Sequence, residues 1–240
     1  MKIITFLFLC FVFNSVFAFD FSNFGSGNTV NEGSIFIDNN KVSGSSQSGI
    51  KGSGIITSRQ YSLNPFTKII LNIVADVKVV ASNKFRFKIH GDDNVIELIT
   101  STVNNKQLQI QSTKNYSTQN PISIVIEMPM LQEINQLGAG NIKLDNVTKE
   151  TLNIILSGSG IVSARGNADK LTASITGSGS LHLQQLKTRN ASITIEGVGS
   201  VFVNVAKHLN AKINGMGDII YSGKPSVTRR IQGLGRIAHK

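Results

Sequence analysis

The chain has 240 residues, of which 40% are hydrophobic and 16% are charged. This composition supplies enough apolar side chains for one folded core, and it excludes an acidic disordered chain, a coiled coil, a multi-domain enzyme and a polytopic membrane protein. Lys and Arg outnumber Asp and Glu by 24 to 14, which favours anionic surroundings but does not identify a partner.

Residues 1–18 are predicted to be a cleaved signal peptide. Lys2 gives a positive start, residues 3–13 are almost entirely apolar, and Ala18 ends a small-residue cleavage pattern. An uncleaved anchor is disfavoured because the apolar run is shorter than the ~20 residues of a spanning helix. A lipoprotein signal is excluded because Leu9, which is not small, precedes Cys10.

Cleavage after Ala18 would remove the only cysteine, so the mature chain is expected to have no thiol and no disulfide. No later segment is long and apolar enough for a transmembrane helix. The protein is therefore expected to be exported to the periplasm, the outer surface or the medium.

Residues 19–60 are predicted to be a flexible segment rich in Gly, Ser and Asn, with a weak strand signal at residues 34–37. Gly-Ser-Gly occurs at residues 25–27 and 52–54. Neither copy has the Lys-Ser/Thr ending of a P-loop or the third glycine of a dinucleotide fingerprint, so no cofactor is predicted.

Residues 61–136 alternate or run apolar in five stretches that predict strands, at residues 66–80, 84–90, 95–100, 107–111 and 122–128. Residues 104–106 are predicted to be a turn. This region carries no Gly-x-Gly unit. We expect wider, less regular coils here, with a separate small sheet as the alternative.

A Gly-x-Gly unit recurs six times in the second half of the chain, at intervals of 20, 19, 20, 18 and 18 residues. Apolar residues keep a fixed register four and six positions after the first glycine and two and six positions before it. Around one unit these residues are Val162, Ala164, Leu156 and Leu152. The twelve glycines, predicted to be structural corners, are Gly138, Gly140, Gly158, Gly160, Gly177, Gly179, Gly197, Gly199, Gly215, Gly217, Gly233 and Gly235.

This repeat predicts an all-β fold, a right-handed parallel β-helix with ~19-residue coils. The alternation is that of strands with one buried face, and ~19 residues are too few for a βαβ unit. An antiparallel sandwich is the alternative, but its hairpins would show Asn-Gly or Asp-Gly pairs and no strict register. Residues 61–240 would form roughly nine coils, a rod of about 45 Å. Residues 137–223 are the regular coils.

The last residues, 224–240, are predicted to form an irregular basic cap. Pro225 interrupts the coil, Arg229 takes a position that is apolar in earlier repeats, and His239 takes another. A solenoid needs such an ending because its last coil has no further coil to pair with.

Several short motifs follow one another in an order that resembles the bacterial head GIN domain family, described as putative autotransporter adhesins. They comprise residues 52–54 (GSG) with Arg59, then 66–69 (FTKI), 75–79 (ADVKV), 91–94 (GDDN), 107–110 (QLQI), 128–131 (MPML), 137–140 (LGAG) and 156–160 (LSGSG). The resemblance covers residues 52–223. It implies a right-handed β-helix and an adhesin-like role, and it supplies no catalytic residues.

No catalytic, cofactor-binding or metal-binding residues are predicted. β-Helix enzymes that act on polysaccharides need carboxylates stacked on neighbouring coils. The acids of the repeat occupy different offsets, so no such stack forms: Asp145, Glu150, Asp169, Glu196 and Asp218. His90 with Asp92 and Asp93 is the densest polar cluster and is predicted to be a solvated turn rather than a metal site.

The predicted function is an exported, non-enzymatic envelope or surface protein that binds or assembles through the β-helix. An enzyme or binding module for anionic polysaccharide is the alternative. Nucleic-acid binding is disfavoured by export and by the lack of basic residues interleaved with aromatic ones.

A candidate interaction strip lies near the C-terminal end. Outward positions there become apolar on successive coils, which is typical of a contact surface. The strip comprises Val198, Phe202, Met216, Ile220 and Leu234, with Lys212, Arg230 and Arg236 beside it. It is expected to contact an envelope protein, a surface polymer or a second copy of the chain. Local packing of the same side chains is the alternative.

Overall fold

The structure is a computed structural model that describes residues 9–12, 15–18, 34–38, 41–45 and 49–240. The chain divides into two compact units, residues 1–47 and 48–240. In the first unit, β1 (Leu9–Val12) pairs with β2 (Ser15–Ala18), and β3 (Ser34–Asp38) pairs with β4 (Lys41–Ser45). Much of the predicted signal peptide and the residues that follow Ala18 lie outside the described residues, so its cleavage stays a prediction.

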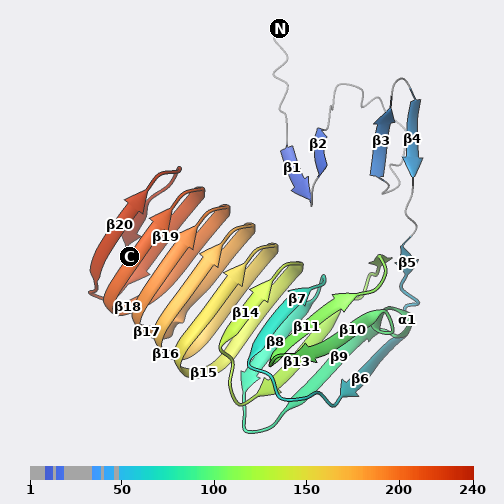
Figure 1. Ribbon diagram of the computed structural model, residues 1–240, viewed down its shortest axis with the longest axis horizontal. Coiled ribbons are helices and arrows are strands. Elements are labelled where there is room, and N and C mark those ends of the chain that lie inside the picture. Colours follow the sequence, from blue (N-terminus) through green and yellow to red (C-terminus); the bar gives the residue numbers. More distant parts are fainter. Residues whose placement is uncertain (1–8, 13–14, 19–33, 39–40, 46–48) are drawn as a thin grey trace. The chain divides into compact units, whose positions relative to one another are not determined.

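The second unit is an all-β solenoid. Four long strands each make up most of one coil and stack in parallel register: β15 (Ala139–Leu156), β16 (Ser159–Ile175), β17 (Ser178–Ile195) and β18 (Val198–Ile213). Figure 1 shows them side by side. The solenoid has about five turns of about 20 residues rather than the nine expected. The predicted β-solenoid is thus confirmed, whereas its right hand stays a prediction.

The apolar columns predicted from the repeat point into the core of these turns. Between residues 142 and 219 each of them is buried: Ile142, Leu144, Leu152, Leu156, Val162, Ala164, Leu171, Ile175, Leu181, Leu183, Ala191, Ile195, Val201, Val203, Leu209, Ile213 and Ile219. The alternate residues Lys143, Thr172 and His182 are exposed, and Ser163 and Thr194 are half-buried. The predicted inward and outward faces are therefore confirmed.

The Gly-x-Gly units lie where one long strand ends and the next begins. β15 ends at Leu156 and β16 starts at Ser159, which leaves Gly158 in the break between them. A Cβ atom on Gly158 or Gly160 would overlap backbone oxygen of the preceding coil, at Gly138 or Gly140. The coils approach one another too closely at these positions for any side chain.

Residues 49–136 extend the solenoid but do not coil regularly. β6 (Ile56–Tyr61), β9 (Arg86–Asp92), β13 (Ser123–Met128) and β8 (Asp76–Ala81) continue one side, and β10 (Ile99–Asn104), β11 (Gln107–Ser112), β7 (Lys68–Asn72) and β14 (Glu133–Gln136) continue another. Three of these pairings are antiparallel: β6–β9, β9–β13 and β10–β11.

Two expectations about this region are therefore wrong. It is not a run of wider coils, because three of its strand pairs are antiparallel, and β10 returns to β11 through a short turn at the positive-φ pair Asn105 and Lys106. The predicted flexible segment also ends earlier than residue 60, because β5 (Ile50–Lys51) pairs with β12 (Tyr116–Ser117) and β6 pairs with β9. The strand signal at residues 34–37 coincides with β3.

The two ends of the solenoid are closed differently. At one end, the short helix α1 (Asp93–Ile96) buries Val95 and Ile96 completely. Figure 1 shows α1 and β6 at the end opposite to β20. The strand predicted at residues 95–100 begins only at residue 99, where β10 starts. The structure places the last residues of α1 at 95–96 because two consecutive apolar side chains can both enter the core from a helix, whereas a strand would direct one of them outward.

The C-terminal end is more regular than the predicted irregular cap. After β19 (Met216–Ser222), β20 (Ser226–Ile231) pairs with β18 and β21 (Ile237–His239) pairs with β19, both in parallel register. Arg229 follows Ala211 in its column, and its Nη2 donates a 2.8 Å hydrogen bond to the hydroxyl of Tyr221. His239 packs edge-on against the same ring, 5.2 Å between centroids. Polar side chains thus cover the end of the core, while the backbone continues as a partial coil.

Candidate functional site

A hollow follows one side of successive coils of the solenoid. We call it the lateral groove and define it by residues 148–150 of β15, 167–169 of β16, 187–189 of β17 and 206–207 of β18. A second hollow shares residues 148–150 and extends to Lys68, Met130, Gln132 and Glu133. The groove therefore runs across the coils.

The lateral groove contains four cationic residues, Lys149, Lys187, Arg189 and Lys207, and two acidic residues, Glu150 and Asp169. Arg189 forms a loose ion pair with Asp169, 3.7 Å between Nε and Oδ1. Lys149, Lys187 and Lys207 form no ion pair within the described residues. Because Lys187 and Lys207 are also exposed, they are available to a ligand with negative charge.

The groove forms where the coils differ in length. The register between neighbouring coils shifts at Leu144/Val147, at Ser163/Arg165 and at Leu183/Lys187, and each shift marks a bulge or irregularity. A bulge changes the direction in which the following side chains point and interrupts the strict alternation of inward and outward residues. Sequence reasoning missed this site because the repeat columns flank it and no column passes through it.

The predicted interaction strip is divided in the structure. Val198, Met216 and Leu234 stack on one another and are 47%, 49% and 71% exposed. Phe202 and Ile220 form a second stacked pair, but both are half-buried. The two rows are separated along the strands by outward positions that hold Ser200, Asp218 and Arg236, of which the last two form a 3.1 Å ion pair.

The five apolar residues thus form two short rows rather than one continuous strip. Phe202 also packs edge-on against His182 of the preceding coil, 5.4 Å between ring centroids, as the alternative of local packing predicts. A contact role for the exposed row of Val198, Met216 and Leu234 stays a prediction.

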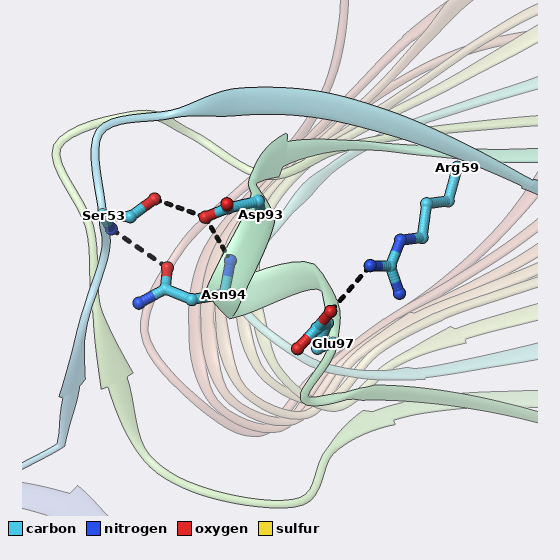
Figure 2. A network of polar contacts seen from close by, with 5 residues as sticks. All are labelled: Ser53, Arg59, Asp93, Asn94 and Glu97. Carbon is cyan, nitrogen blue, oxygen red and sulfur yellow. Dashed lines mark hydrogen bonds and ion pairs between the residues drawn. The ribbon is translucent and has the colours of Figure 1, made fainter.

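A polar network joins two motifs that lie far apart in the sequence. Ser53 donates a backbone hydrogen bond of 3.0 Å to Asn94 Oδ1 and a side-chain hydrogen bond to Asp93 (Figure 2). Arg59 of β6 forms a 2.7 Å ion pair with Glu97, just after α1. This network fastens the segment before β6 to the helix that closes the core.

Asp92 anchors the same region from inside. Its side chain is 1% exposed and accepts hydrogen bonds from Thr118 Oγ1 and from Asn120 Nδ2, the latter at 2.8 Å. A Cβ atom on Gly52 would overlap this carboxylate. The predicted solvated turn is wrong for Asp92, because its carboxylate is buried and bridges chain segments.

These contacts set the ionisation of Asp92. Hydrogen bonds from Thr118 and then Asn120 lower the pKa of the Asp92 carboxyl below its usual value, although desolvation opposes them. A carboxyl group whose pKa is lowered by folding stabilises the protein above its unfolded pKa of about 4, and this stabilisation is lost as the pH falls through the folded pKa.

We therefore expect the free energy of unfolding to depend on Asp92 at neutral pH and to lose that dependence in acid. The gap in stability between the parent and Asp92→Asn should be full above about pH 5 and should close at lower pH. Denaturant unfolding from pH 2 to 7 measures it, with the exposed Asp169→Asn as control. A gap that is constant over this range would contradict the prediction.

The remaining candidates do not assemble into a catalytic or metal centre. Within the described residues, no three His, Cys, Asp or Glu side chains are close enough to hold a metal ion. His90 forms a 2.9 Å hydrogen bond with Ser58, whereas buried Asp92 bonds to Thr118 and Asn120. Asp145 is 3% exposed and lies between Arg165 and Lys78, with its oxygens 2.8 and 3.8 Å from their nitrogens. In the described part of the chain, no helix is long and apolar enough to cross a membrane.

Three solved structures share the fold over 80% of this chain. A putative adhesin from Bacteroides fragilis has 24% sequence identity and a TM-score of 0.65, with 100% of its own chain covered. A putative adhesin from Parabacteroides merdae has 19% identity, a TM-score of 0.55 and 98% coverage. A putative lipid binding protein from Parabacteroides distasonis has 20% identity, a TM-score of 0.53 and 99% coverage.

At these identities the likeness shows the fold and nothing about ligands. No functionally curated protein matches the chain. A family model described as "Putative auto-transporter adhesin, head GIN domain" matches residues 65–225, which is more than half of the chain and includes the four long strands. The chain therefore belongs to the head GIN domain family.

Proposed function

We propose that this protein is an exported, non-enzymatic binding protein of the adhesin type, which holds an anionic surface polymer in the lateral groove. The observation that carries the proposal is the presence of three lysines in this groove, Lys149, Lys187 and Lys207, which form no ion pair among the described residues. The proposal includes a right-handed coil with the Gly-x-Gly units at its corners.

Charge and family membership support this proposal. Residues 49–240 contain 22 Lys and Arg against 11 Asp and Glu, so the solenoid attracts anions from a distance. The family is described as adhesins, and the N-terminal residues have the pattern of a signal peptide. The acids of the repeat lie apart, as Asp145 and Asp218 do in separate ion pairs, which favours binding over hydrolysis of the polymer.

The shape of the groove suits a linear polymer. Its lysines come from three coils, those of β15, β17 and β18, and neighbouring coils are spaced by ~4.8 Å, so a chain laid along the solenoid would meet several of them. Each exposed contact is weak by itself and is screened by salt, so affinity would arise from several contacts made together.

The test compares charge reversals inside and outside the groove. In surface-based binding to polygalacturonate, with neutral dextran as reference, Lys187→Glu with Lys207→Glu is expected to weaken binding roughly tenfold or more. The control, Lys84→Glu with Lys114→Glu, changes the net charge equally at exposed positions outside the groove. Equal losses in the two double variants would show that net charge alone, and not the groove, attracts the polymer.

A further inference from the structure

The last strands of the solenoid have one unpaired edge each. Among the residues that the structure describes, β20 of the 15-stranded sheet pairs only with β18, and β21 pairs only with β19. Part of the backbone N–H and C=O groups of β20 therefore face away from the protein. Such an edge is a template for one more strand, and proteins use it to bind extended segments.

The side chains of this edge have a definite chemistry. Residues 224–240 contain five basic residues and no acid. In β20, Arg229 and Arg230 follow one another and so point to opposite faces of the strand, and neither forms an ion pair within the described residues. Val227 and Ile231 flank them on the core side, half-buried and 46% exposed respectively.

We propose that β20 binds an extended acidic segment of a partner protein by strand addition. An added strand in register would place one side chain over Arg229, on the end of the core, and the next side chain beside Arg230. Carboxylates at these two positions form charge-assisted hydrogen bonds with the two guanidinium groups. Apolar residues two positions before and two positions after the first carboxylate would cover Val227 and Ile231. The segment therefore has the pattern apolar, any residue, acidic, acidic, apolar.

Charge distinguishes this partner from a second copy of the chain. Two β20 edges placed together would bring the arginine pairs of both copies into one interface, where like charges repel. Two other strands of the sheet, β6 and β10, have one partner each within the described part of the chain. The β10 sequence has no charged residue, and Arg59 of β6 is already paired with Glu97, so neither edge selects an acidic strand in this way.

The experiment is hydrogen–deuterium exchange of the purified protein with synthetic peptides. The first is acetyl-Gly-Val-Thr-Asp-Glu-Ile-Gly-amide. The second replaces Asp and Glu with Asn and Gln, and the third replaces Thr with Pro, which disrupts strand pairing while it keeps both charges. We expect the first peptide to protect the amides of residues 226–231, the second to bind at least about tenfold more weakly and the third to give no protection. Residues 99–104 of β10 serve as the internal reference and should not be protected.

Two results would overturn the proposal. One is the absence of protection at residues 226–231 with the first peptide at saturation. The other is equal protection by the proline peptide or by polygalacturonate, which would show a general anion surface rather than strand addition. The double variant Arg229→Gln with Arg230→Gln should bind the first peptide at least about tenfold more weakly. If this variant does not fold, hydrogen–deuterium exchange of the parent protein with the three peptides is the test.

This proposal does not depend on the function proposed for the lateral groove. Lys187→Glu with Lys207→Glu lies outside β20 and should bind the first peptide as the parent does. Arg229→Gln with Arg230→Gln should in turn keep most of its polygalacturonate binding. The two ideas can therefore fail separately.

Discussion

Replacing Ile195 with aspartate is expected to unfold the solenoid or to lower its stability by about 4 kcal/mol or more. Ile195 is fully buried, and its neighbours in the column are Ile175 and Ile213 of the adjacent coils. A carboxylate in this position would have no partner and no water, and a buried unpaired charge is among the costliest single changes in a protein core. Domains have a total stability of only about 5–15 kcal/mol, so little folded protein would remain.

The neighbouring residue provides the control. Thr194 points to the outer face of the same strand, where it is half-buried and lies beside Lys212. Thr194→Asp introduces the same charge one position away and should change stability by about 0.5 kcal/mol or less. Urea unfolding followed by circular dichroism measures both variants. Similar midpoints for Ile195→Asp and the parent would show that this column does not lie in the core.

The regular coils were predictable because their constraint is local and repeated. Each inward residue packs on its equivalents one coil before and after, so the sequence must keep an apolar residue at the same offset each time. The register that the glycines imply, such as Gly160 beside Gly140 and Gly179, is the register of the strands. A single repeat would not have indicated this fold, because a short alternating stretch is compatible with any half-buried strand.

The region before residue 137 was less predictable because its strands find distant partners. β13 is parallel to β8 and antiparallel to β9, yet its alternating sequence is compatible with both arrangements. Five residues of β6 belong to a stretch that has the composition of a linker, so the sequence did not indicate a strand there. The position of β6 is determined by its pairing with β9. Pairing over such separations is not encoded in the local pattern of residues.

The lateral groove was not predictable for a related reason. Between the inward columns, the stretch from Leu144 to Leu152 is longer than the stretch from Val203 to Leu209, and bulges absorb the difference. Where spacing varies, equivalent offsets no longer identify equivalent positions. The cationic residues could therefore be assigned to one groove only after the pairing of the strands was known.

A second large effect is expected where the coils touch through glycine. A Cβ atom on Gly160 would overlap the backbone of Gly140, and Gly160 has a φ of +130°, which side chains disfavour. Gly160→Ala therefore combines overlap with backbone strain. We expect it to lower the free energy of unfolding by about 3 kcal/mol or more, since each of the two effects costs roughly 1–3 kcal/mol.

Two further glycines separate these contributions. Gly54 has a φ of +81° with open space around it, so Gly54→Ala tests strain alone and should cost about 1 kcal/mol. Gly199 lacks the positive φ but lies against Gly179 of the preceding coil, so Gly199→Ala tests overlap alone and should cost roughly 1–3 kcal/mol. Thermal and urea unfolding of the three variants give the comparison. If Gly160→Ala costs no more than Gly54→Ala, the coils can separate to admit a methyl group, and close contact between them is not what requires glycine in the repeat.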